Sequence, residues 1–293
     1  MLTVIKKYKK LKIKHFGNYR MELSAVTKNV QSILSAQKKY IIPRYQREYS
    51  WEREELTQLW EDIWSSIEYA DSKFTVGEYF IGSIVLSGSD QGEELEVVDG
   101  QQRLTTLSIL LSALRASFEK CNLPKIAEGA YSYIEGQDKD GEDFFRIVNP
   151  LVQPYFNDCI LYKLPKNTHP RNDEEKRLKY AYDFFINKLK MVEIKKIFKN
   201  EDEVEYSILL KAVRDQLLGF KLIYITVSEK KYANTIFETL NAKGKELTPV
   251  DLIKNEIFSI MDSEHPSDTA RYKWASIRDD LNSRSRGTSV VVN

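Results

Sequence analysis

The stretch LEVVDGQQRLTTLSILLSALRASFEK, residues 95–120, decides the fold. Its opening residues, Leu95–Val98, are apolar or β-branched apart from one glutamate, and they predict a buried strand. After Asp99 and Gly100, apolar residues recur at steps of three and four and predict a helix over 102–120. The residues of this apolar stripe are Leu104, Leu107, Leu111, Leu114 and Phe118. The sequence therefore predicts a buried strand that leads directly into a long helix.

The junction between this strand and this helix has the chemistry of an anion site. The first amides of a helix lack partners within the helix and lie at the positive end of its dipole. Gly100 lets the backbone approach a ligand closely, and the planar guanidinium of Arg103 suits phosphate oxygens. Asp99 could hold Mg²⁺ or its water shell, while Gln101 and Gln102 could orient water or phosphate. The alternative interpretation is a capped helix with a surface arginine.

A second concentration of polar and aromatic residues is IPRYQREYSW, residues 42–51. Its arginines, glutamine and aromatic rings could supply phosphate contacts and base stacking. Alternatively, Tyr49 and Trp51 pack the following helix against the core, and the two arginines are solvated. We interpret Trp51 as a core residue and assign a function to the polar residues Arg44, Gln46 and Arg47.

The rest of the chain alternates between strand and helix patterns. Residues 79–86 and 95–98 predict a hairpin whose turn lies at Gly88–Gly92. Lys254, on an otherwise apolar helix, is the residue there whose chemistry a structural role would leave unused. The other expected elements are a strand over 221–227, helices over 24–37, from 174, over 203–218 and over 231–240, and a helix start at Thr248–Asp251.

Composition narrows the class of protein. The chain has 293 residues, of which 42% are hydrophobic and 30% charged, with a net charge of +1, so we expect a globular protein rather than one coated for DNA binding. Its two cysteines form no CxxC pair, its three histidines are scattered, and no apolar run reaches the about 20 residues of a membrane span. These features favour a cytoplasmic protein without a metal-binding cysteine or histidine cluster. The lysine-rich residues 1–20 are interpreted as a solvated leader, or alternatively as a basic arm that touches nucleic acid.

Three segments, in this order and at this spacing, resemble the GmrSD-type restriction family. They are IPRYQREYSW (42–51), then FIGSIVL (80–86) with VVDGQQRLTTL (97–107), then IFETLNAKGKELTPVDLIKN (236–255). The resemblance covers roughly residues 21–281 and implies an α+β fold. It implies a ParB/sulfiredoxin-like, nucleotide-binding domain over 21–120 and a mainly helical domain over 121–293, after the basic arm.

The resemblance also implies a function in bacterial defence, in which nucleotide hydrolysis at the DGQQR segment is coupled to sensing of modified DNA. The implied cofactors are a nucleoside triphosphate, GTP or another, and Mg²⁺. The implied catalytic residues are Asp99, Gln101, Gln102 and Arg103, with Asp99 as the metal ligand. The implied nucleotide-binding residues are Gly100, Arg103, Arg44, Gln46 and Arg47, and the DNA-sensing residues are Tyr45 and Gln46.

Full-length members of the family usually continue into an HNH nuclease domain. His15, His169 and His265 form no His-Asn-His pattern, so we expect no DNA cleavage by this chain. We predict a nucleoside triphosphatase that senses or regulates within a DNA restriction system, with DNA and an HNH nuclease domain as partners; a homodimer is compatible with this. The alternatives are a nucleotide-switched binding module without turnover and a modified-DNA sensor that uses no nucleotide.

Overall fold

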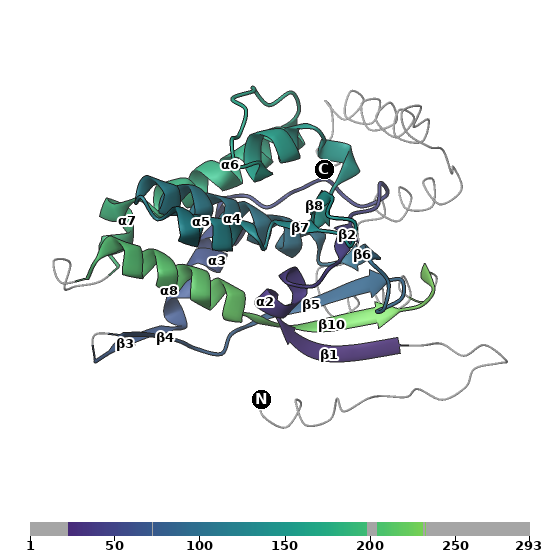
Figure 1. Ribbon diagram of the computed structural model, residues 1–293, viewed down its shortest axis with the longest axis horizontal. Coiled ribbons are helices and arrows are strands. Elements are labelled where there is room, and N and C mark those ends of the chain that lie inside the picture. The colour runs from purple at the N-terminus through teal and green to yellow at the C-terminus, as the bar shows by residue number, and fades with distance from the viewer. Residues whose placement is uncertain (1–22, 72, 198–203, 231, 233–293) are drawn as a thin grey trace, which may run out of the picture. The chain divides into compact units, whose positions relative to one another are not determined.

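The computed structural model describes residues 23–71, 73–197, 204–230 and 232 (Figure 1). Helices and strands both contribute, and the α+β prediction is confirmed. The helices are α2 (Val30–Leu34), α3 (Arg53–Ser65), α4 (Gln101–Lys120), α5 (Pro124–Tyr131), α6 (Asp173–Lys188), α7 (Met191–Lys195) and α8 (Tyr206–Gly219), with short turns η1 (Pro150–Val152) and η2 (Asn157–Leu161). The strands are β1 (Leu23–Asn29), β2 (Lys39–Ile41), β3 (Ile67–Ala70), β4 (Lys73–Val76), β5 (Phe80–Ser87), β6 (Glu94–Asp99), β7 (Glu135–Gln137), β8 (Asp143–Phe145), β9 (Ile147–Val148) and β10 (Lys221–Val227).

A mixed six-stranded sheet with the order β1-β10-β5-β6-β2-β9 carries the site. The predicted hairpin is confirmed, because β5 and β6 pair antiparallel. Strand β10 was predicted with its observed bounds, and it pairs in parallel with β5 and antiparallel with β1. Figure 1 shows β1, β10 and β5 running side by side. Since β9 and β10 follow residue 120, the two domains expected from the sequence share one sheet.

The predicted helix over 24–37 is wrong in its first half. Leu23–Asn29 is strand β1, which pairs with β10 along its whole length. The helix α2 begins only at Val30, and the Asn29 side chain caps it by accepting a hydrogen bond from the Ser32 N–H at 2.9 Å. Pairing with a strand almost two hundred residues away in sequence therefore overrides the local helical pattern.

The sheet separates two groups of buried side chains. Along β10, Leu222 and Tyr224 belong to the main hydrophobic core, whereas Ile225 and Val227 belong to a smaller cluster. Val85 of β5 joins the smaller cluster. This alternation is that of a strand covered on both faces.

Helix α4 lies at the centre of the main core. It packs against α5, α6 and α8, which Figure 1 shows beside it, and buried side chains occur all around it. Polar side chains on the helix bond to its own carbonyls: Ser108 Oγ donates to Leu104 O at 3.1 Å, and Ser117 Oγ donates to Ala113 O at 2.8 Å. These bonds satisfy hydroxyls that burial would otherwise leave without a partner.

The chain divides into two compact units. One comprises Met1–Ile42 with Glu48–Phe237, and the other comprises Pro43–Arg47 with Glu238–Asn293. In the second unit the structure describes only the turn at Pro43–Arg47, where the Gln46 N–H donates to Pro43 O at 3.1 Å. The basic arm, the expected helix over 231–240 apart from residue 232, and the expected helix start at 248–251, with Lys254, lie outside the described residues.

Candidate functional site

The turn from β6 into α4 is made by Gly100, in a conformation that other residues rarely adopt. Its φ is +93°, and its carbonyl accepts the Leu104 N–H at 3.0 Å, which opens the helix. A Cβ at this position would lie 2.5 Å from Cγ2 of Ile84. Glycine is therefore required both by the backbone angle and by the close approach of β5.

A β-bulge precedes this turn. Val85 lies opposite Asp99 and Leu86 lies opposite Val97, so Val98 is an extra residue in β6. Val97 packs into the main core and Val98 into the smaller cluster. Because a bulge changes the direction of the side chains that follow it, the bulge sets the direction of the half-buried Asp99 at the end of the strand.

The start of α4 differs from the starts of α3 and α6. At α3, the Glu55 carboxylate accepts the Glu52 N–H at 3.0 Å; at α6, Asn172 accepts the Glu175 N–H at 2.8 Å, and the first turn holds three acidic residues. Helix α4 begins at Gln101 after Gly100, which supplies no side-chain cap, and its first turn has no acidic residue. Its own first turn therefore leaves the positive end of the dipole uncompensated.

Arg103 adds a full positive charge to this first turn. Its side chain is half-buried, and Nη1 donates to the carbonyl of Ser83 at 2.8 Å. Within the part of the chain that the structure describes, no carboxylate forms an ion pair with Arg103. The guanidinium is thus fixed by a neutral acceptor, and no described carboxylate lies within ion-pair distance of it.

Gln102 uses both ends of its amide to hold another segment of the chain. Its Oε1 accepts the Ser50 N–H at 2.9 Å, and its Nε2 donates to Glu48 O at 3.0 Å. The side chain is only 6% exposed. Gln102 therefore positions Glu48–Ser50 against α4, a role that its place in the sequence did not indicate.

Tyr49, which lies between Glu48 and Ser50, is held by two hydrogen bonds of its own. Its hydroxyl shares a hydrogen bond of 2.8 Å with Thr106, and its N–H donates to the Glu174 carboxylate at 2.9 Å. Burial raises the pKa of Tyr49 above its usual range, so the phenol stays protonated. Tyr49 is thus a packing residue, as the alternative interpretation of this segment had it. No local sequence pattern signals the contact with Glu174, which is 125 residues away.

The other predicted site residues keep their roles as predictions. Asp99 is half-buried and Gln101 is 6% exposed, both beside the turn. Arg44, Tyr45, Gln46 and Arg47 belong to the second unit, and their position relative to α4 is not determined. Among the described residues, no three His, Cys, Asp or Glu side chains gather where they could hold a metal ion.

The sequence matches the family described as GmrSD restriction endonuclease, N-terminal domain, over residues 30–258. The chain belongs to this family. Its GmrSD N-terminal domain makes it part of a restriction, or phage-defence, system, and the matched residues include the whole junction from β5 to α4. No curated protein matches the chain. None of the helices in the described ranges has the length and apolar character that crossing a membrane requires.

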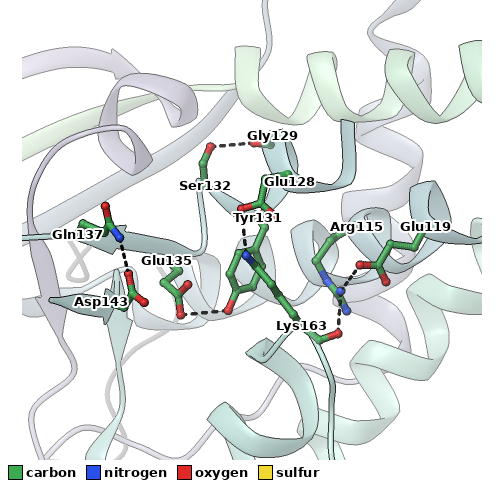
Figure 2. A network of polar contacts seen from close by, with 10 residues as sticks. All are labelled: Arg115, Glu119, Glu128, Gly129, Tyr131, Ser132, Glu135, Gln137, Asp143 and Lys163. Atoms are coloured by element: carbon green, nitrogen blue, oxygen red, sulfur yellow. Dashed lines mark hydrogen bonds and ion pairs between the residues drawn. The ribbon is translucent and has the colours of Figure 1, made fainter. Parts of the chain in front are cut away.

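The GmrSD domain contains a second arginine on α4, at the opposite end of the helix (Figure 2). Arg115 is 2% exposed, and its Nη1 donates to the Glu119 carboxylate and to Lys163 O, each at 2.9 Å. Its guanidinium lies 6.0 Å from the ring of Tyr131, whose hydroxyl donates to Glu135 at 3.1 Å. This arginine joins α4 to the chain after η2 through Nη1, while its buried Nε has no hydrogen-bond partner among the described residues.

Proposed function

We propose that the β6–α4 junction binds the phosphates of a nucleoside triphosphate, and that the chain hydrolyses this nucleotide within its restriction system. The observation that carries the proposal is Arg103: it lies in the first turn of an uncapped helix and, among the described residues, has no carboxylate partner. A half-buried guanidinium without a neighbouring acid is stabilised by a bound anion. Helix amides and a guanidinium together suit phosphate oxygens.

Each residue of the junction has a part in this proposal. Arg103 neutralises the charge that develops on the transferred phosphoryl group. Asp99 would hold Mg²⁺, which would supply charge stabilisation for the phosphates, and Asp99 would also position water. Gln101 orients the attacking water. Because its amide is engaged with backbone, Gln102 acts by holding Glu48–Ser50.

Two further contributions extend the proposal to the remaining predicted residues. Arg44, Gln46 and Arg47 bind nucleotide phosphate, and the nucleotide is GTP or another nucleoside triphosphate. Tyr45 and Gln46 face DNA that carries a modification. Both follow from the motif that contains these residues.

The test is magnesium-dependent release of phosphate from each nucleoside triphosphate. Arg103→Ala should lower the rate about a hundredfold, as loss of one charge-stabilising donor does in other enzymes. The matched control is Arg53→Ala, which removes an exposed arginine from the first turn of α3, a turn that contains two glutamates. It should leave the rate unchanged. Equal rates for the parent and Arg103→Ala would end the proposal of catalysis.

Binding measurements on the same proteins distinguish two other outcomes. Saturable nucleotide binding without product would replace hydrolysis by a conformational switch. Binding of modified duplex DNA without any nucleotide affinity would assign the junction to DNA phosphate instead. Both outcomes overturn hydrolysis, and only the second overturns nucleotide binding.

A further inference from the structure

Strand β5 contains a bulge of its own, next to the junction. Lys221 of β10 lies opposite Phe80, and Ile223 lies opposite Ser83, so β5 holds one residue more than β10 over this step. Gly82 lies in this step with a φ of +107°. A glycine inside a strand often marks a bulge or a close approach of other atoms.

At Gly82 the close approach is that of Arg103. A Cβ on residue 82 would lie 3.1 Å from Cζ, 3.2 Å from Nη2 and 3.3 Å from Nε of Arg103. The carbonyl of the next residue, Ser83, accepts from Nη1 at 2.8 Å. The guanidinium therefore lies against bare backbone and is anchored by one hydrogen bond beside it.

We propose that Gly82 is a positioning residue of the anion site: its missing side chain and the Ser83 carbonyl fix the direction of the Arg103 guanidinium. This inference rests on the proposed function of Arg103. A guanidinium carries five N–H donors, and the described residues accept from one nitrogen, Nη1. Nε and Nη2, the two nitrogens beside Gly82, keep N–H donors for the oxygens of a phosphate, and the fixed orientation leaves less rotamer entropy to lose on binding.

Gly82 and Gly100 have different partners. At Gly100 the close neighbour is the apolar side chain of Ile84, which belongs to the core. At Gly82 it is the functional group of the arginine itself. A side chain at residue 82 would therefore push the guanidinium by a few tenths of an ångström and change binding, in addition to the backbone strain that the positive φ imposes.

The experiment is a double-mutant cycle that measures binding of inorganic tripolyphosphate, so that neither base recognition nor turnover contributes. Gly82→Ala and Arg103→Ala should each weaken binding about tenfold or more, the usual cost of disturbing a charged hydrogen bond. The double variant should bind as Arg103→Ala does, because Gly82 acts only through Arg103. Gly141→Ala is the control: residue 141 also has a positive φ, +84°, but an added Cβ there meets no atom within 4 Å. It should bind as the parent does.

The outcomes separate this inference from the proposed function. If the two losses add in the double variant, Gly82 acts independently of Arg103 and the inference is overturned, while the proposed anion site stands. If Arg103→Ala binds as tightly as the parent, both are overturned. Arg103→Lys provides a test that leaves Gly82 intact, since lysine keeps the charge but has no planar fork. Arg103→Lys should bind about tenfold more weakly than the parent. Parent-like affinity would contradict the proposal that Gly82 and the Ser83 carbonyl orient a planar guanidinium.

Discussion

The two ends of α4 hold an arginine in opposite ways. Arg115 is 2% exposed and donates to a carboxylate and to a backbone carbonyl. Arg103, about three turns earlier, is half-buried and donates to the carbonyl of Ser83, without a carboxylate partner among the described residues. The fold pairs the charge of Arg115 with a carboxylate and leaves the charge of Arg103 available to an anion.

This difference implies that Arg115 contributes mainly to the stability of the fold and Arg103 mainly to the binding of an anion. A buried arginine with an acidic partner contributes packing and hydrogen bonds that unfolding would lose. An arginine without an acidic partner contributes less to folding, and its charge gains most when an anion arrives. Substitutions at the two ends of the same helix should therefore affect different measurements.

The largest effect is expected from Arg115→Ala. It removes a side chain enclosed by α5 and the chain after η2, and should lower the free energy of unfolding by about 3 kcal/mol through lost packing and lost hydrogen bonds. Arg103→Ala should lower it by less than about 1 kcal/mol. Urea unfolding of both variants checks the contrast. A reversed order would show that Arg103 is the structural arginine.

A smaller effect is expected from Gln102→Leu. Leucine leaves the Ser50 N–H and the Glu48 carbonyl without their partner, which should cost about 2 kcal/mol in unfolding experiments. Gln58→Leu is the control, since Gln58 is exposed on α3 and its amide donates to the carboxylate of Asp62, one turn later on the same helix. Unchanged stability together with lost hydrolysis would return Gln102 to the catalytic role that the sequence suggested.

The sequence predicted the elements that periodicity encodes. It placed the strand, the turn at Gly100 and the helix of the junction within one residue of their observed bounds, since these depend on neighbours in the chain. It also placed β10 correctly as a strand, but not between β1 and β5. Strand order depends on pairing between distant segments, which local periodicity does not encode.

The predicted site shows the same division. Arg103 stood out because its type and its place at a helix start suffice to suggest an anion site. The contact between Gln102 and Ser50 could not be predicted in this way, because Ser50 is 52 residues away and contributes its backbone N–H, not its side chain. The sequence placed Gly82 in a strand and in the segment FIGSIVL, but its contact with Arg103 depends on the three-dimensional pairing of the strands.

The smallest effect is expected at Glu135, in the network around Arg115. Burial raises the pKa of this carboxyl above its ordinary value of 4.5, although the hydrogen bond from Tyr131 works in the opposite direction. The folded chain therefore binds this proton more tightly than the unfolded chain does, so its contribution to stability is present below pH 4.5 and is lost as the pH rises through the folded pKa. Glu135→Gln should remove this loss, making the protein slightly more stable at neutral pH and its stability less dependent on pH above 4.5. Urea unfolding at several pH values measures this, with the exposed Glu142→Gln as the charge-matched control. A variant that loses stability at neutral pH would mean that the ionised carboxylate stabilises the Arg115 end of α4, and that this end depends on charge more than the enclosed geometry indicates.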